Sequence, residues 1–288
     1  MKISRVEAPR CSVGEGPVWD VAEQALYFVD ILGKVVMRHD PATESTHSWP
    51  VPGIIGSMAL REGGGAIVAL EDGVYTLDFD TGDCAPLARP GTVDPRVQFN
   101  DGKVDRRGRF IVGTTDRGMK EYIGEVLSLD ESGRLTTIDS GICISNGPCW
   151  SPDDKTFYFS DSIPKTIYAY DYDVDSGLVA NRRVFASTVD LGGIPDGATV
   201  DADGCMWMAI CEGAKVVCFR PDGGIERIVE TPVPLPASVM FGGPDLDRLY
   251  VTSIDPAFLG RPSPAGSGDL FVIDGLGVRG VAEPRYRG

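Results

Sequence analysis

The sequence predicts an all-β fold, a six-bladed β-propeller with four-stranded antiparallel blades. A pair of short apolar strands occurs six times, and successive copies begin 40 to 49 residues apart. A spacing in the forties is typical of one propeller blade. No segment keeps a helical period next to a capping box, so we expect almost no helix. We also expect a single domain over residues 1–288, because no linker or low-complexity tract separates the copies.

Every copy has the same order of parts: a turn rich in Asp and Gly, a first strand, a loop, and a second strand that often ends in Asp. The first strands are expected at 25–30, 65–70, 109–113, 156–161, 206–209 and 248–252. The second strands are expected at 35–40, 74–78, 126–130, 167–171, 216–219 and 270–274. This regularity indicates one repeated unit of a few strands.

Acidic side chains outnumber basic ones, with 42 Asp and Glu against 27 Lys and Arg and a net charge of −15. Such a charge repels nucleic acid and anionic membranes, so we expect neither as a partner. It favours small neutral or cationic substrates and metal cations. The 36 Gly and 21 Pro suit a fold with many tight turns.

The seven cysteines are scattered and form no Cys-x-x-Cys pair, which indicates neither a disulfide framework nor a thiolate zinc site. The N-terminus lacks the apolar segment of a signal peptide, and no stretch approaches about 18 apolar residues. We therefore expect a cytoplasmic protein. We expect it to be a monomer or a small homo-oligomer.

One acidic cluster has the length of a calcium-binding loop. It runs from Asp201 to Glu212, with Glu212 at the twelfth position. Met206 stands where such a loop needs glycine, and the flanks have the pattern of strands. We therefore interpret the cluster as a hairpin turn.

Polar residues interrupt the apolar strands at equivalent places in four copies, each time beside Gly or Pro. Equivalent places in a circular array converge on its axis, where propellers bind ligands. The alternative is that each motif is a tight turn whose polar side chain caps backbone groups. The four motifs are Gly-Glu-Gly-Pro at 14–17, Phe-Asn-Asp-Gly at 99–102, Ser-Asn-Gly-Pro at 145–148 and Pro-Asp-Gly at 195–197.

Two carboxylates that meet at an axis repel each other unless a cation lies between them. A divalent cation relieves the repulsion between Glu15 and Asp196, and the carbonyl of Asn146 provides a third ligand. An all-oxygen set suits Ca²⁺, Mg²⁺ and Mn²⁺, and also allows Fe²⁺ and Zn²⁺. His39 lies at the end of an expected strand, and His47 lies in the turn that follows. Because these are the only histidines, we expect no histidine-based metal site.

These motifs resemble the family that contains regucalcin (senescence marker protein), gluconolactonase and luciferin-regenerating enzyme. The segment 142–149 is similar to bacterial sugar-acid lactonases such as xylonolactonase. The likeness begins near residue 12, keeps the order of the motifs and continues to the end of the chain. It is carried by the segments 12–19, 99–105, 144–148, 195–197 and 241–252.

The resemblance implies a metal-dependent hydrolase that opens a small sugar lactone to the aldonic acid. One divalent cation is expected on Glu15, Asn146 and Asp196. This cation is Ca²⁺ or Zn²⁺, with Fe²⁺, Mn²⁺ or Mg²⁺ as alternatives. Asp196 is also the expected general base, and Asn100 is expected beside the cation, where it binds the substrate. Two alternatives stay open: an esterase or phosphotriesterase on the same scaffold, and a non-catalytic calcium-binding propeller.

Two residues depart from the pattern of the family. Relatives often carry Arg where this sequence has Gln98, and many bacterial members carry Trp where it has Cys211. We expect Gln98 to contact the substrate in a pocket that is more open and less cationic than in those relatives. The segment 116–122 is either a lid over this pocket or an ordinary solvated loop.

Overall fold

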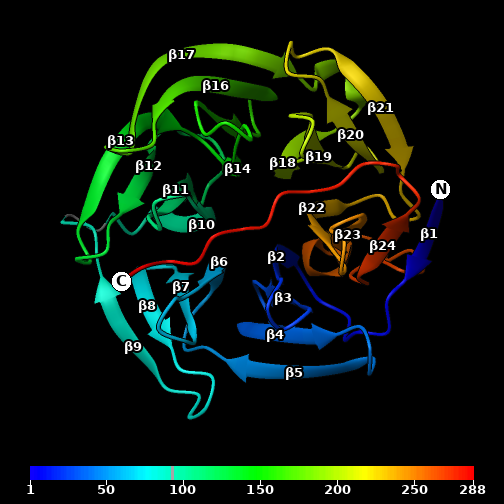
Figure 1. Cartoon of the computed structure of the whole chain (residues 1–288), viewed down its shortest axis with the longest axis horizontal. Helices are drawn as coiled ribbons and strands as arrows, with labels where there is room; N and C mark the ends of the chain where they lie inside the picture. The colour runs from blue at the N-terminus through cyan, green and yellow to red at the C-terminus, as the bar shows by residue number, and fades with distance from the viewer. Residues whose placement is uncertain (92–93) are drawn as a thin grey trace.

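The computed structural model describes residues 1–91 and 94–288, and its strands form six four-stranded antiparallel sheets arranged in a ring (Figure 1). The prediction of a six-bladed propeller is confirmed. The innermost strand of each blade contacts the innermost strands of both neighbouring blades. These strands are β2 (Gly14–Asp20), β6 (Ile55–Leu60), β10 (Val97–Val104), β14 (Ser145–Trp150), β18 (Ile194–Val200) and β22 (Pro236–Gly242).

Five blades are built from four consecutive strands, ordered from the axis outward. The first two blades add β3 (Ala25–Asp30), β4 (Val35–Asp40) and β5 (Ser45–Pro50), then β7 (Ala66–Leu70), β8 (Gly73–Leu77) and β9 (Cys84–Ala88). The third and fourth add β11 (Phe110–Asp116), β12 (Gly124–Leu129) and β13 (Leu135–Ile142), then β15 (Thr156–Asp161), β16 (Thr166–Asp173) and β17 (Leu178–Ser187). The fifth adds β19 (Met206–Cys211), β20 (Lys215–Phe219) and β21 (Ile225–Glu230).

The sixth blade closes the ring, because it joins the two ends of the chain. β23 (Arg248–Ser253) and β24 (Phe271–Asp274) pair outward from β22, and the N-terminal strand β1 (Lys2–Arg5) pairs with β24 as the outermost strand. The first and last strands therefore share one sheet. The described residues otherwise contain only two short 3₁₀ helices, η1 (Val189–Leu191) and η2 (Pro256–Leu259). None of the helices in the part that the structure describes is long and apolar enough to cross a membrane.

The core lies between the faces of adjacent blades. Between the first two blades, Tyr27, Met58 and Val68 are almost fully buried in one cluster, and the ring of Tyr27 stacks on Phe79 with centroids 5.4 Å apart. Corresponding apolar clusters fill the other gaps. Such burial contributes about 25 cal/mol for each Å² of apolar surface removed from water. Among the described residues, all six sheets lie within single blades, so side-chain packing and side-chain hydrogen bonds hold neighbouring blades together.

Asp residues at the ends of β3 and β15, the strands next to the innermost strands, fix the loops at one face of the ring, which we call the upper face. The carboxylate of Asp30 accepts hydrogen bonds from the backbone N–H groups of Ser12, Val13 and Gly33 at 2.9, 3.0 and 3.1 Å. In the fourth blade, Asp161 accepts from Cys143 and Ile144 in the same way. Asp30 and Asp161 therefore satisfy backbone donors just before the innermost strands β2 and β14.

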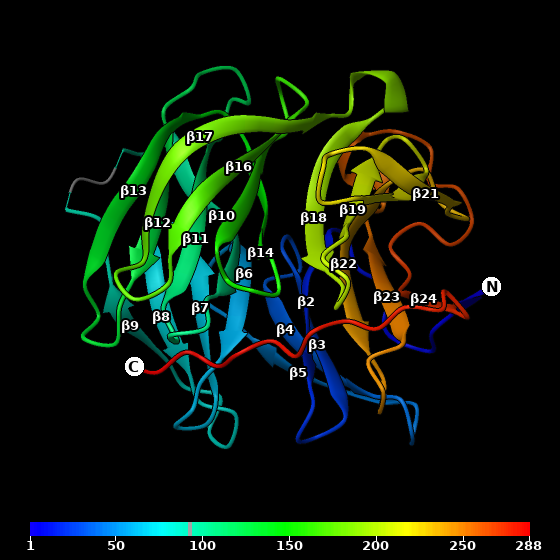
Figure 2. The same ribbon diagram turned by 45° about the horizontal axis from the view of Figure 1, so that its top comes forward.

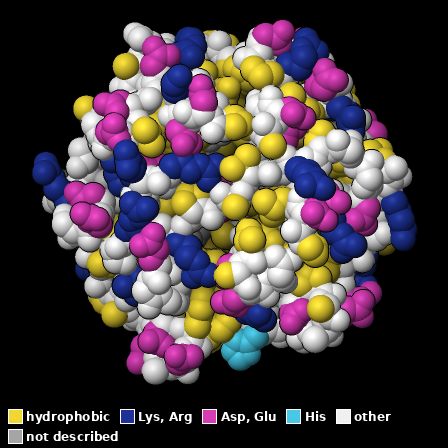
Figure 3. Space-filling model, viewed as in Figure 1, with side chains coloured by type: hydrophobic (Ala, Val, Ile, Leu, Met, Phe, Trp, Pro, Cys, Tyr) yellow, Lys and Arg dark blue, Asp and Glu magenta, His cyan; other side chains and the backbone are white. Residues whose placement is uncertain are grey.

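The opposite, lower face is crossed by residues 275–288, which we call the C-terminal strap (Figures 1 and 2). The strap leaves the sixth blade and hydrogen-bonds through its backbone to turns of the other blades. Gly280 donates to Leu246, Arg279 accepts from Ala202, and Tyr286 donates to Leu60, each at 2.8 Å. Figure 3 shows this face, on which acidic and basic side chains are interspersed.

We expect Asp30→Ala to lower the free energy of unfolding by about 3 kcal/mol, because it leaves three backbone donors near the upper face without their acceptor. Urea denaturation of both proteins measures this difference. Asp40→Ala is the matched control, since Asp40 caps a solvent-exposed turn through Ala42 and Thr43, where water replaces the carboxylate. Equal losses for the two variants would show that the Asp30 hydrogen bonds contribute nothing specific.

Candidate metal centre

Every innermost strand is irregular at the same place, near its upper end. In β2 the pairing with β3 skips from Glu15 to Val18, and in β14 the pairing with β15 skips from Asn146 to Cys149. The pairing of β18 with β19 skips from Pro195 to Ala198, which leaves Asp196 unpaired. An irregularity of this kind re-aims the side chains beside it. The polar residues of the four sequence motifs all lie at these points.

The structure brings these motifs together at the axis. The Nδ2 atom of Asn100 donates to Oδ1 of Asn146 at 3.1 Å and to the backbone carbonyl of Ser145 at 2.7 Å. The carboxylate of Asp101 accepts from the backbone N–H of Gly147 at 2.9 Å. These contacts join β10 to β14, which are neighbouring innermost strands.

The next junction, between β14 and β18, is equally tight. A Cβ atom on Gly147 would lie 2.8 Å from the backbone oxygen of Asp196, and Gly147 has a φ of +60°. Asn146 donates through Nδ2 to Oγ of Ser162 at 2.9 Å, and Ser162 donates to the backbone carbonyl of Pro195 at 2.7 Å. Ser162 therefore fixes the amide of Asn146 relative to the strand that carries Asp196.

Buried negative charge dominates the electrostatics of this centre. Glu15, Asp101 and Asp196 are each 7% exposed. Burial raises the pKa of the Glu15 carboxyl well above its usual value, and the charges of Asp196 and Asp101 raise it further. Burial and the charge of Asp101 likewise raise the pKa of Asp196. The fold thus holds carboxyl groups together that repel one another when ionised.

The chemistry of the donors fits a divalent cation. Glu15 and Asp196 supply carboxylate oxygens, and the carbonyl of Asn146 is defined because its Nδ2 atom is used by Ser162. A cation among these oxygens would offset the repulsion that raises the pKa values of both carboxyls. The residues that could hold such an ion are therefore the three that the sequence motifs indicate. Asn100 lies directly against Asn146.

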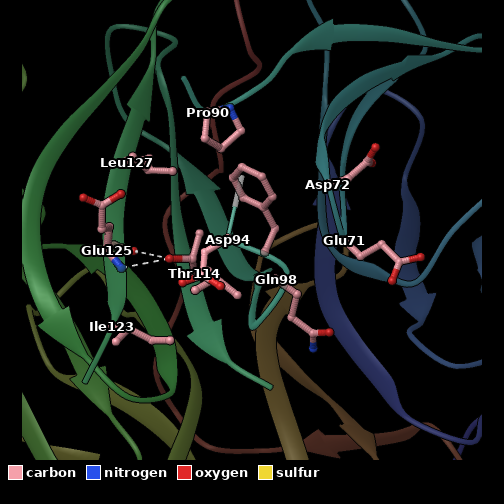
Figure 4. Close-up of a pocket in the computed structure, with 11 residues that line it drawn as sticks. Glu71, Asp72, Pro90, Asp94, Gln98, Thr114, Ile123, Glu125 and Leu127 are labelled. Atoms are coloured by element: carbon pink, nitrogen blue, oxygen red, sulfur yellow. Dashed lines mark hydrogen bonds between the residues drawn. The ribbon is translucent and has the colours of Figure 1, made fainter. Parts of the chain in front are cut away.

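Gln98 lies in a separate cavity of about 110 Å³ between the second and third blades (Figure 4). Its side chain lies between Glu71 and Thr114, and the cavity is further lined by Asp72, Asp94 and Glu125. Of the residues that the structure describes, none of Glu15, Asn100, Asn146 and Asp196 lines this cavity. The structure thus places Gln98 on the same strand as Asn100 but does not bring it among the axial side chains.

The lid candidate is anchored at its base. The carboxylate of Asp116 accepts from the backbone N–H groups of Gly118, Lys120 and Glu121 at 3.1, 2.9 and 2.9 Å. Arg117 forms an ion pair with Glu71 at 3.0 Å, which places the loop beside the cavity that contains Gln98. Met119 and Tyr122 are 58% and 52% exposed.

The sequence interpretation did not single out several residues that the structure places at the centre. Asp101 is as buried as the two carboxylates predicted as ligands. Ser162 and Lys103 make hydrogen bonds that join different innermost strands. Of these three residues, only Asp101 had a signal in the sequence, because it follows Asn100 in one of the four motifs. Cys211, which the sequence marks only as a departure from the family, is buried, and burial and the charge of Asp196 raise the pKa of its thiol well above the usual value.

A second group of potential ligands lies on the lower face, where Asp201, Cys205 and Cys218 approach one another. Both oxygens of Asp201 already have donors. Oδ1 accepts from the backbone of Asp203 and Cys205 at 3.1 and 2.8 Å, and Oδ2 accepts from the indole of Trp207 at 2.8 Å. These contacts are those of the hairpin turn that the sequence predicts, and they account for the buried carboxylate without a cation.

Comparison with known proteins identifies the relatives of this chain. Residues 13–255 match the model of the SMP-30/Gluconolactonase/LRE-like region. Regucalcin of Xenopus laevis is 36% identical, and the match covers 100% of this chain and 99% of that protein. Pentonolactonase XacC of Haloferax volcanii is 35% identical, with 100% and 98% covered.

Two solved structures share the fold over nearly the whole chain. The luciferin-regenerating enzyme superposes with a TM-score of 0.93 at 27% sequence identity. The superposition covers 100% of this chain and 99% of that enzyme. The calcium-binding protein regucalcin of Agrobacterium tumefaciens superposes with a TM-score of 0.91 at 28% identity, covering 99% of this chain and 97% of its own.

We expect Gly147→Ala to lower the free energy of unfolding by at least about 2 kcal/mol more than Gly82→Ala. Both glycines have a positive φ, so both variants carry the backbone penalty of about 1–2 kcal/mol. Only at Gly147 does the added methyl group meet another strand, the one that carries Asp196. Gly82 has open space at this position. Denaturation in urea without added metal measures both, and equal losses would contradict the close approach of β14 and β18.

Proposed function

Because the chain belongs to the SMP-30/gluconolactonase/LRE-like family, we propose that it hydrolyses a small sugar lactone to the aldonic acid with one divalent cation on Glu15, Asn146 and Asp196. The convergence of two buried carboxylates and an oriented carboxamide at the axis carries this proposal. The pairing of the first and last strands in one blade further supports a single domain over residues 1–288.

Lactone hydrolysis requires a polarised carbonyl, a water nucleophile and a proton for the leaving ring oxygen. A divalent cation at this position supplies Lewis acidity toward the carbonyl oxygen. Asp196 acts as the general base: its carboxylate takes a proton from the attacking water while the new C–O bond forms at the lactone carbonyl. The bond between that carbon and the ring oxygen then breaks, and Asp196 returns the proton to the ring oxygen, which leaves as a hydroxyl group.

The other axial residues position the reactants. Glu15 and Asn146 would hold the ion together with Asp196, and Ser162 fixes the orientation of the Asn146 amide by accepting a hydrogen bond from its Nδ2 atom. Asn100 orients the lactone by a hydrogen bond that its amide oxygen accepts from a substrate hydroxyl, because its Nδ2 atom already donates to Ser145 and Asn146. The pentonolactonase of Haloferax volcanii favours a lactone of a pentonic or similar acid as the substrate class.

Two other functions have specific support. The regucalcin structure from Agrobacterium is described as that of a calcium-binding protein, which favours Ca²⁺ among the candidate ions and allows a binding role without catalysis. An esterase or phosphotriesterase would need the same polarised oxygen and the same base. Lactones, aryl esters and phosphotriesters assayed after metal stripping and after add-back of each ion distinguish these functions, at or below neutral pH against an enzyme-free control.

We expect Asp196→Ala to lower kcat/KM for the best aldonolactone by about 10³-fold or more, since it removes a ligand and the base together. Asn100→Ala should cost less, because it removes hydrogen bonds to the substrate, Ser145 and Asn146 but neither a ligand nor the base. In the native protein, an ion at about 100 times its Kd should raise the unfolding free energy by about 2.7 kcal/mol. This rise should disappear in Asp196→Ala, and a preserved rise would place the ion elsewhere.

We expect Gln98→Arg to change the ratio of pentonolactone to hexonolactone turnover. Gln98 lines a cavity together with Glu71, Asp72, Asp94 and Glu125, so an added cation would alter the charge and the space of this cavity. Arginines pair with three of these acidic residues, Glu71, Asp72 and Asp94, so the described part of the lining offers no unpaired cation to an anionic group and favours a neutral lactone. An unchanged ratio would mean that the substrate does not reach Gln98.

A further inference from the structure

A buried ion pair lies on the axis between the candidate metal centre and the C-terminal strap. The Nζ atom of Lys103 is 3.5 Å from Oε1 of Glu283, and the two side chains are 11% and 13% exposed. Lys103 lies at the lower end of β10, and Glu283 belongs to the strap. The cavity beside the pair has a volume of about 10 Å³, which is the least that a single water needs. The strap therefore packs closely on Lys103.

Lys103 reaches across the axis to a strand that is not its neighbour. Its Nζ atom donates to the backbone carbonyl of Ala198 in β18 at 2.8 Å, while β14 lies between β10 and β18 in the ring. Ala198 is the first residue of β18 that pairs again with β19 after the irregularity at Asp196. The ammonium group therefore fixes the lower side of the backbone irregularity that aims Asp196.

The same lysine lies near a carboxylate that holds the strand of the third ligand. Lys103 is two residues after Asp101, and its charge favours the ionised form of Asp101, whose pKa burial raises. Asp101 in turn accepts from Gly147, next to Asn146. A buried carboxylate that loses its counter-charge becomes strongly unfavourable. Lys103 thus hydrogen-bonds to the strand of Asp196, and its charge acts on Asp101, which supports the strand of Asn146.

The strap holds its end of the pair firmly. Tyr286 is fully buried, and its hydroxyl donates to the backbone carbonyl of Asp130 at 2.7 Å. On the other side of Glu283, Arg106 donates to the backbone carbonyl of Ala282 at 2.6 Å. The strap that carries Glu283 passes over the middle of the ring (Figure 1).

We propose that Lys103 and Glu283 are positioning residues of the metal centre, through which the C-terminal strap sets the geometry of β14 and β18 at Asn146 and Asp196. This inference rests on the proposed function, because it takes these two residues as ligands. Glu283 pairs with the ammonium group, and the ammonium group donates to Ala198 in the strand of Asp196. Two residues before Lys103 on β10, Asp101 accepts from Gly147 in the strand of Asn146. Groups behind a metal ligand typically change metal affinity by 10–100-fold when they are removed.

The test compares Glu283→Gln with Arg285→Gln in the full chain. Both variants remove one ion pair of the strap, but Arg285 pairs with Asp20 and donates to Arg61 in turns of the first two blades, away from Lys103. Two quantities are measured: the Kd for Mn²⁺, from the electron paramagnetic resonance of the free ion, and the hydrogen exchange of β14 and β18 peptides in metal-free protein. We expect Glu283→Gln to raise the Kd about 10-fold and to speed exchange in both strands. Arg285→Gln should leave both quantities within about twofold of the native values.

Equal effects of the two variants on either quantity would overturn the proposal, since the strap would then act only through general stability. If Glu283→Gln does not fold, Glu283→Asp replaces it, with smaller changes expected in the same directions. Native protein that binds no Mn²⁺ would count against the proposed function. In that case the exchange of β14 and β18 in the metal-free variants still decides whether Glu283 positions these strands.

Discussion

The repulsion among buried carboxylates at the axis is the interaction that constrains the rest of this structure. Glu15, Asp101 and Asp196 are each 7% exposed, and their mutual charges oppose ionisation. A flexible chain would relieve the repulsion by turning these groups toward water. Here each of them is carried by an innermost strand that contacts two neighbours, so the groups stay together. The ring of blades supplies the rigidity, and a cation that offsets the repulsion would also stabilise the fold.

The close meeting of the innermost strands depends on residues with no side chain or a small one. A Cβ on Gly56 would lie 2.6 Å from the backbone oxygen of Phe99, and one on Gly197 would lie 1.9 Å from Oγ of Ser238. Gly197 directly follows Asp196. Gly56 lies at the irregularity of β6, the position that the motifs occupy in other innermost strands. The Gly and Pro that flank Glu15, Asn146 and Asp196 in the sequence thus reflect the space at the axis as well as turn geometry.

Much of the fold could be read from the sequence, because each blade repeats one local pattern that can be seen in a short window. The residues that interrupt this pattern, such as Glu15 and Asp196, were visible for the same reason. Asp101 was not distinguished, since an Asn-Asp-Gly sequence is also typical of an ordinary turn. The closure by β1 and the pairing of Lys103 with Glu283 join segments that are far apart in the chain and follow no period. Only the folded arrangement of the ring brings these segments together.

The candidate metal ligands and the residues expected to select the substrate lie in different parts of the molecule. The candidate metal ligands lie on strands that are buried, bulged and linked by hydrogen bonds through Ser162 and Lys103. Gln98 and the loop after Asp116 lie in and beside a cavity whose acidic residues pair with arginines at the surface, such as Arg89 with Asp72. Changes in these loops can therefore alter which lactone fits while the axial geometry stays constant. This separation explains how the two departures of this chain from its relatives can coexist with an intact set of axial oxygens: Gln98 lies in the cavity, and Cys211 ends β19, which is not an innermost strand.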